Sequence, residues 1–398
     1  MMEMQGSIGM LPPEAIRPVV LQVVPDLQDG GLQRSAVDIA EALTAAGCTA
    51  VVASAGGPLE HRLTRAGAIH ESVPLASRNP ASIYSNIQRL IDVIERHQVE
   101  IVHARARAPG WSALTAAQRS GRHFVTSVHA VYPDGNILQR RYNAVLVRGE
   151  RVIATSQFIA DYLRENHGVD PTRLRLIRRG VDLRSFSPEA VSNERLIKRV
   201  NDWRLPDGQP VVMLPARLER RKGQALLLEA VARLGDLDFV CLLVGAEAGR
   251  GNYRRELDEL IQRHELAHRC VVLDHCDDMP AAYKVANVVV AAGSEPQSFV
   301  RTISEAQAMG RPVVTVDHGG AGEQVIAGHT AFLAPPNDAA GLASAIRRAL
   351  DLTEEQRERL AEEAIAFTRR HFSRDEMCAQ TLALYDEILR QAMAAAAS

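Results

Sequence analysis

The chain has 398 residues, few cysteines and no long apolar run. No stretch approaches the ~20 apolar residues that a membrane-spanning helix needs. The five cysteines are odd in number, scattered, and form no CxxC pair, so the sequence predicts neither a zinc site nor a disulfide framework. The first eighteen residues lack a basic segment followed by an apolar core, which predicts no secretory signal. These absences favour a protein of the reducing cytoplasm.

Aromatic residues are scarce, and lysine is missing from the first 190 residues. Aromatics make up 4% of the chain and the pI is near 6.7, which is a poor fit to a nucleic-acid-binding protein. Residues 1–190 contain 21 Arg, no Lys and 18 Asp+Glu, with a cluster at Arg140, Arg141, Arg148 and Arg151. Two readings stay open: a chance excess of arginine, or a half that faces anionic material such as lipid headgroups. The second places the protein peripherally on the inner face of the membrane.

What is present is an alternation of short apolar runs and amphipathic stretches. A chain of this length is expected to fold as two domains. Continuous apolar runs suit strands that are buried on both faces of a parallel sheet. The predicted strands are 19–24, 49–53, 101–103, 124–128, 152–154, 174–177, 211–214, 239–244, 270–273, 288–291, 313–316 and 332–334. Amphipathic stretches lie between them, so the sequence predicts two doubly wound α/β domains.

Proline residues and an Asp-Gly pair near residues 187–210 predict a turn-rich linker between the two domains. We expect an N-terminal Rossmann-like domain over 1–190, a second one over 191–371, and a C-terminal helix over 372–398.

Candidate site residues of the first half come directly after predicted strands, because ligands of open α/β sheets bind beyond the carboxyl ends of the strands. Gly30 and Gly31 follow the first strand and begin a helix, where glycine permits close approach of a ligand and the helix N-terminus favours an anion. His129 ends another strand and is expected to face a cleft. For His103 and its neighbours Arg105 and Arg107, ligand contact and a solvated loop are equally open.

The second half offers a more informative set. Arg217 and Lys222 flank a tight loop between a strand and a helix, an arrangement that suits a pyrophosphate clamp. A second helix begins near Phe299, where its first backbone N–H groups are free for a phosphate. Glu305 lies one to two turns into that helix and can accept hydrogen bonds from two ribose hydroxyls.

With these residues in view, the chain resembles the family 4 retaining glycosyltransferases. The resemblance spans nearly the whole chain and includes Gly30-Gly31 and the strand that ends at His129. Its other motifs are RRGVDLRSFSP (178–188), ARLERRKG (216–223), LLVGAEAG (242–249), SEAQAMGRPVV (304–314) and HTAFLAPP (329–336). It implies a GT-B fold, in which two Rossmann-like domains face a cleft, and the use of a nucleotide-sugar.

The resemblance also implies roles for single residues. Arg217 and Lys222 would hold the diphosphate and stabilise the departing nucleotide, and Glu305 would hold the ribose. Residues Phe299, Val300 and Arg301 would place backbone N–H groups near the phosphate and sugar. From the N-terminal side, His129 and Gly31 would line the donor sugar. No metal or cofactor is expected, since Arg and Lys supply the positive charge. The N-terminal domain would bind the acceptor, and the last helix would cross back onto it.

Two positions depart from the family pattern. The family has Glu–x7–Glu, but the position eight residues before Glu305 is Gln297, and the nearest acid, Glu295, comes two residues too early. A glycine usually follows the Phe, whereas this chain has Val300, whose branched side chain narrows the room for the donor.

The leading hypothesis is therefore a hexosyltransferase that uses a UDP- or GDP-sugar and a glycan or glycolipid acceptor. Sequence segments such as EAQAMGRPVV are similar to segments of bacterial lipopolysaccharide-core transferases. This similarity favours a role in the synthesis of envelope polysaccharide or lipopolysaccharide. Two alternatives remain. One is a sugar-nucleotide-binding GT-B protein with weak or lost transferase activity. The other is a GT-B epimerase, whose acid and base residues cannot be placed in this sequence.

Overall fold

The computed structural model describes residues 17–28, 30–77, 79–132, 135–247 and 252–397. Residues 1–16, which include most of the segment where no secretory signal is expected, and Ala248 and Gly249 of the LLVGAEAG motif lie outside the described residues. The chain forms two compact units. Unit 1 comprises the residues up to Arg179 together with those from Arg374 onward, and unit 2 runs from Gly180 to Ser373. The domain limits drawn from the sequence stay a prediction.

Unit 1 is built on a seven-stranded parallel sheet in the order β3-β2-β1-β4-β5-β6-β7. Val20 of the central strand pairs with Ala50 on one side and Ile101 on the other. The strands are β1 (Val19–Val23), β2 (Thr49–Ser54), β3 (Ile69–Ser72), β4 (Ile101–Ala104), β5 (His123–Val128), β6 (Arg151–Ala154) and β7 (Leu174–Leu176). Every residue of β4 is buried, and β1, β2, β5 and β6 are buried except at the first residue, as expected for strands with helices on both faces.

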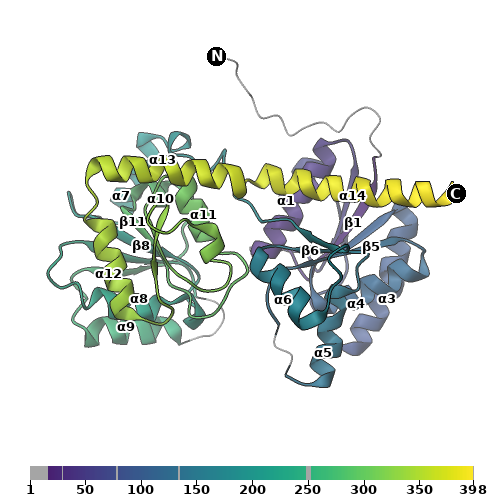
Figure 1. The fold of residues 1–398 in the computed structure, drawn as a ribbon, viewed down its shortest axis with the longest axis horizontal. Coiled ribbons are helices and arrows are strands. Elements are labelled where there is room, and N and C mark those ends of the chain that lie inside the picture. Colours follow the sequence, from purple (N-terminus) through teal and green to yellow (C-terminus); the bar gives the residue numbers. More distant parts are fainter. Residues whose placement is uncertain (1–16, 29, 78, 133–134, 248–251, 398) are drawn as a thin grey trace, which may run out of the picture. The chain divides into compact units, whose positions relative to one another are not determined.

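The helices of unit 1 cover both faces of this sheet (Figure 1). They are α1 (Gly31–Ala45), α2 (Glu60–Ala66), α3 (Pro80–His97), α4 (Arg107–Arg119), α5 (Ile137–Asn143), α6 (Gln157–His167) and α14 (Arg374–Ala396). Their ends follow local chemistry. The side chain of Asn79 caps α3 by accepting a hydrogen bond from the Ala81 amide, Pro80 occupies the first turn, and Gln98 ends the helix in the left-handed conformation.

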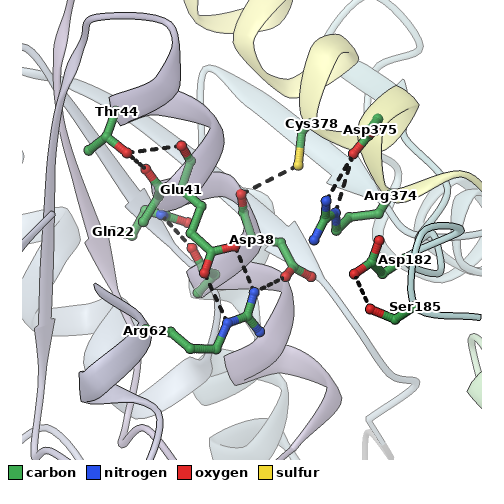
Figure 2. A network of polar contacts seen from close by, with 12 residues as sticks. Gln22, Asp38, Glu41, Thr44, Arg62, Asp182, Ser185, Arg374, Asp375 and Cys378 are labelled. Atoms are coloured by element: carbon green, nitrogen blue, oxygen red, sulfur yellow. Dashed lines mark hydrogen bonds and ion pairs between the residues drawn. The ribbon is translucent and has the colours of Figure 1, made fainter. Parts of the chain in front are cut away.

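The C-terminal helix α14 returns to unit 1 and packs on α1. Its residues Met377, Leu384 and Tyr385 are buried in the same core as Val37 and Ala40 of α1. Figure 2 shows the polar side of this contact, where the Cys378 thiol lies 3.5 Å from the Asp38 carbonyl oxygen. On the other side of α1, Arg62 of α2 donates to Asp38 and Glu41 and so joins the two helices (Figure 2).

Unit 2 has a six-stranded parallel sheet in the order β10-β9-β8-β11-β12-β13. The strands are β8 (Val211–Pro215), β9 (Val240–Val244), β10 (Cys270–Leu273), β11 (Val288–Ala291), β12 (Val313–Val316) and β13 (Ala331–Ala334). Its helices are α7 (Asn193–Asp202), α8 (Gln224–Val231), α9 (Tyr253–Arg263), α10 (Met279–Val285), α11 (Arg301–Ala308), α12 (Ala339–Leu350) and α13 (Glu354–His371). The two doubly wound α/β domains predicted from the sequence are thereby confirmed.

One strand was not predicted. In β3 the sequence Ile-His-Glu-Ser has one aliphatic residue, and none of its four residues is buried. It lies at the edge of its sheet and pairs only with β2. An edge strand covered on fewer sides tolerates polar residues and so lacks the continuous apolar run on which the prediction depended.

Both sheets reverse their strand order at one point, between β1 and β4 in unit 1 and between β8 and β11 in unit 2. The loops at the carboxyl ends of two such strands diverge toward opposite faces, which leaves a crevice where ligands bind. In unit 2 these are the segments that follow Pro215 and Ala291. Among the described residues, no helix is long and apolar enough to span a membrane.

Candidate functional site

The loop after β8 brings its basic side chains against the loop after β11. A 3-10 turn at Arg220–Lys222 ends at Gly223, which has a φ of +82°. A Cβ at this position would overlap the Ala292 carbonyl group at the end of β11. Glycine at 223 is therefore required twice, for the left-handed backbone and for the close approach of the two loops. This approach places Lys222 beside the segment that follows β11.

Lys222 is the buried member of a cationic cluster. Its Nζ donates a hydrogen bond to Gln297 Oε1 at 2.6 Å. Burial, reinforced by the positive charge of Arg221 and then of Arg217 and Arg301, lowers the pKa of Lys222 to about 8, while Glu219 opposes this shift.

The cluster has little negative charge of its own. Arg217 Nε lies 3.4 Å from Glu219 Oε1, and Arg221 pairs with the other oxygen of the same carboxylate at 2.6 Å. The Arg217 side chain is 57% exposed. Cations crowded around one carboxylate at the crevice of the sheet suit a ligand with more than one negative charge.

Gln297 is held in this cluster by its backbone. Its carbonyl oxygen accepts a hydrogen bond from the Gly320 amide at 2.8 Å. A Cβ at Gly319 would lie 2.9 Å from that oxygen, and one at Gly320 would overlap Ser298, so the glycine pair lets the two loops pack together. Glu295, the acid considered as a substitute, is exposed. Of these two side chains, Gln297 is the one hydrogen-bonded to Lys222.

The start of α11 presents fewer free amides than the sequence predicts. The Val300 amide donates to Gln324 Oε1 at 2.7 Å, and Gln324 Nε2 returns a bond to the Val300 carbonyl oxygen at 3.0 Å. The Phe299 ring is buried against Phe372, with ring centroids 5.9 Å apart. The helix begins at Arg301, whose amide and that of Thr302 have no acceptor within the helix. These two amides, rather than that of Val300, are available to an anion.

Glu305 is buried, and a tyrosine from another helix orients it. The Tyr283 hydroxyl, on α10, donates to Glu305 Oε2 at 2.7 Å, and Arg301 Nε lies 3.8 Å from Oε1. Burial and the Glu305 carboxylate raise the pKa of Tyr283 well above its usual value, so the phenol keeps its proton. Tyr283 takes one acceptor position of the Glu305 carboxylate, which can accept further hydrogen bonds. Sequence reasoning missed Tyr283, since nothing in the chain links a residue of α10 to one 22 positions later.

The three remaining candidates, Gly30, Gly31 and His129, belong to unit 1. Arg179 Nη2 donates to the Gly31 carbonyl oxygen, and a Cβ on Gly31 would lie 2.5 Å from that nitrogen. Burial, and then the positive charges of Arg179 and Arg105, hold the pKa of His129 well below its usual range, so its imidazole is neutral. Arg179, which contacts Gly31, was not among the predicted candidates, although it lies within the RRGVDLRSFSP motif.

For His103 and Arg105, the sequence left ligand contact and a solvated loop equally open. His103 is completely buried between the Tyr385 hydroxyl at 2.6 Å from Nδ1 and Ser127 Oγ at 2.5 Å from Nε2, which is the environment of a core residue. Arg105 is 2% exposed, so the solvated-loop reading does not apply to it. Across the described ranges, no group of three or more His, Cys, Asp or Glu side chains is placed to hold a metal ion.

Comparisons with known proteins agree with this geometry. The model of glycosyl transferases group 1 matches residues 198–367, and the model of Glycosyltransferase Family 4 matches residues 29–185. The crystal structure of a glycosyltransferase from Rickettsia africae superposes with a TM-score of 0.88 and 32% identity over 94% of this chain and 99% of that one.

Two further proteins are more distant. A D-inositol 3-phosphate glycosyltransferase of Xylanimonas cellulosilytica is 27% identical over 318 residues, which is 73% of each chain. The Anabaena protein Alr3699/HepE in complex with UDP-glucose gives a TM-score of 0.80 at 23% identity, over 92% of this chain and 99% of that one. The two matched models, the similarity to the Rickettsia enzyme and the paired Rossmann-like sheets lead to one conclusion: this chain belongs to the family 4 glycosyltransferases and has the GT-B fold.

Proposed function

We propose that this glycosyltransferase moves a hexosyl unit from a UDP- or GDP-sugar to a glycan or glycolipid acceptor of the cell envelope, with retention of the anomeric configuration. The observation that carries the proposal is the cationic cluster of Arg217, Arg221, Lys222 and Arg301. Glu219 pairs with two of these cations and Glu305 lies 3.8 Å from Arg301, so the cluster keeps an excess of positive charge. Departure of a nucleoside diphosphate develops negative charge on phosphate oxygens, and preorganised cations stabilise that charge without a metal ion.

The remaining contacts of unit 2 suit the rest of a donor. Glu305 has one acceptor position taken by Tyr283 and can accept further hydrogen bonds from ribose hydroxyls. The amides of Arg301 and Thr302 point along the axis of α11 at its positive end, where phosphate oxygens bind favourably. The UDP-glucose complex of Alr3699/HepE, which shares this fold, makes a UDP-sugar the first donor to examine.

Gln297 is the proposed contact to the sugar. Its side-chain amide oxygen accepts a hydrogen bond from Lys222. Gln297 would therefore link the residue that holds the sugar to a residue that holds the diphosphate. In unit 1 we assign the neutral imidazole of His129 and the backbone at Gly31 to the donor sugar as well. The second candidate function is a sugar-nucleotide-binding protein with weak turnover. Two observations favour it: the uncharged Gln297 side chain, and the Val300 backbone N–H, which already donates to Gln324.

The acceptor side is proposed from unit 1. Helix α5 exposes Ile137 and Leu138 at 74% and 76%, and the exposed Arg140 and Arg141 follow within one turn. An apolar pair beside two arginines is suited to the interface of an anionic membrane, where a glycolipid acceptor resides. We therefore place the protein in the cytoplasm with peripheral contact at the inner face of the membrane. Synthesis of lipopolysaccharide or a related envelope polysaccharide is the process that fits this placement.

The test is a thermal-unfolding screen with UDP-, GDP- and ADP-sugars. A donor that binds the native state alone stabilises it by RT ln(1 + [L]/Kd), about 2.7 kcal/mol at 100 Kd. We expect one UDP- or GDP-sugar series to raise the unfolding midpoint and the ADP-sugars to leave it unchanged. Binding that is followed by transfer of radiolabelled sugar to an envelope glycolipid supports the transferase. Binding without transfer or donor hydrolysis supports the second candidate, and no stabilisation by any nucleotide-sugar contradicts both.

A further inference from the structure

Unit 1 contains a small, partly open cavity lined by polar residues, of which Arg105 has incomplete hydrogen bonds. It lies under the carboxyl ends of β5, β6 and β7, between α1 and α14, and its volume of about 10 Å³ is the room one water molecule needs. Arg105, His129 and Arg179 line it together with the hydroxyl residues Ser127 and Thr155.

Arg105 is the reason the cavity cannot be a packing defect alone. Its guanidinium, 2% exposed, donates from Nε to Gln22 Oε1 at 3.0 Å and from Nη1 to Ser35 Oγ at 3.4 Å. The remaining nitrogen, Nη2, is buried and has no hydrogen-bond partner within 3.5 Å, although the Tyr385 hydroxyl also interacts with this guanidinium. A buried guanidinium N–H left unsatisfied costs more than a neutral one, so a group that accepts this bond is expected in the cavity.

Charge distinguishes the kinds of acceptor. None of the residues that line the cavity is acidic, and two of them are arginines. The acid whose charge acts on the pKa of Arg105 is Asp38, but its effect is smaller than those of Tyr385 and Cys378. Asp38 also already pairs with Arg62 at 2.8 Å. A water molecule would accept a hydrogen bond from the N–H but would leave the buried positive charge of Arg105 uncompensated. An anion would accept the hydrogen bond and also compensate the charge.

We propose that this cavity is a binding site for one small inorganic anion of halide size, held by Arg105 Nη2 and facing Arg179 and His129. The size of the cavity favours a single-atom anion such as chloride over phosphate or sulfate. All residues that line the site belong to unit 1, and its anion compensates the positive charge of Arg105 and Arg179 beside His129. The same hydroxyls that line the cavity can complete the anion's shell.

Bromide crystallography tests the proposal directly. Bromide replaces chloride and is located by its anomalous scattering. We expect a peak in the cavity of the whole protein within about 3.5 Å of Arg105 Nη2, a usual distance for such a contact to a large anion. Density for a water molecule alone, with no anomalous signal after bromide exchange, overturns the proposal.

A solution measurement shows whether the anion binds at ordinary concentrations. Replacing gluconate by chloride at constant ionic strength is expected to raise the unfolding midpoint saturably, by about 3 °C once chloride exceeds its Kd roughly tenfold. The Arg105→Met variant should lose this chloride response, and Arg119→Met, which changes an exposed arginine, should keep it.

Two further results contradict the proposal. Equal midpoints in chloride and gluconate for the unmodified protein would mean that any bromide peak is an adventitious ion only. A chloride response that persists in Arg105→Met places the anion elsewhere. If Arg105→Met does not fold, Arg105→Lys serves, and a shorter cation should weaken the chloride response without abolishing it.

Discussion

At the scale of single residues, Lys222 combines two properties that oppose each other. A lysine buried beside arginines destabilises the folded protein, yet the same charge is what a departing diphosphate needs. Its pKa of about 8 in the folded chain lies below the unfolded value of about 10.4. Between these values the unfolded state binds more protons, so stability from this group rises as the pH increases from 8 to 10.4 and is lowest below 8.

Lys222→Met is therefore expected to stabilise the protein at pH 7, by about 1–3 kcal/mol and thus a few degrees in the unfolding midpoint. The advantage over the unmodified chain should shrink as the pH is raised through 8 and vanish near 10.4. Thermal unfolding of both proteins across this range is the measurement. A variant that is less stable at pH 7 would show that Lys222 is more favourably paired than its surroundings indicate. Arg217→Met, at an exposed position, is the matched control and should shift the midpoint little.

Gln297→Glu tests the departure from the family pattern. A hydrogen bond that involves a charged group contributes ~1.5–3 kcal/mol against ~0.5–1.5 for a neutral pair, a difference of roughly tenfold in rate. We expect the variant to raise kcat for donor turnover by about this factor, with little change in donor affinity. The new carboxylate would also raise the pKa of Lys222, so the alkaline limit of activity should move to higher pH.

The control is Glu295→Gln, which alters the neighbouring exposed acid and should leave kcat near its original value. The opposite pattern, an inactive Glu295→Gln together with an unimproved Gln297→Glu, would mean that Glu295 is the residue that faces the sugar.

At the scale of elements, helix α5 exposes two neighbouring aliphatic side chains, Ile137 and Leu138, to solvent. Transfer of a leucine-sized side chain out of water contributes about 1.5–3 kcal/mol. Replacing both Ile137 and Leu138 by serine is expected to weaken binding to vesicles that contain phosphatidylglycerol by at least 10²-fold. Sedimentation with vesicles measures this, and vesicles of phosphatidylcholine alone should bind the unmodified protein more weakly.

Ile197→Ser in unit 2, at a side chain 59% exposed, controls for the loss of an exposed aliphatic group and should keep vesicle binding. Unchanged binding of the α5 variant would remove this helix from the membrane contact.

The elements also show what the sequence could and could not predict. Continuous apolar runs located every strand that is buried on two faces, while β3 was missed because an edge strand carries polar residues. Residues that directly follow strands, such as Arg217, could be proposed as candidates because a parallel sheet aligns its strand ends. Tyr283 and Gln324 were missed because their contacts to Glu305 and Val300 arise from the packing of separate elements. No periodicity along the chain encodes such a contact.

At the scale of the whole molecule, we expect side chains, and not a metal ion, to compensate the negative charge of the donor diphosphate. Donor hydrolysis or transfer is expected to proceed at the same rate with EDTA as without it, because the cationic cluster of unit 2 supplies the positive charge at the diphosphate. Rate assays with EDTA, and with Mg²⁺ or Mn²⁺ added back, are the check. Activity that disappears with EDTA and returns only with a divalent cation would disprove metal-independence.

The central claim is that Arg217 and Lys222 stabilise the departing nucleotide in the transition state. It is tested most directly by the kcat of donor turnover for Arg217→Met and Lys222→Met, measured beside the Kd of the donor. Charge on the leaving group grows in the transition state, so the account predicts a loss of roughly 10²-fold or more in kcat with a much smaller change in Kd. The contradicting result is a kcat close to that of the unmodified protein in either variant, measured on folded protein at saturating donor. That result would place the donor diphosphate elsewhere.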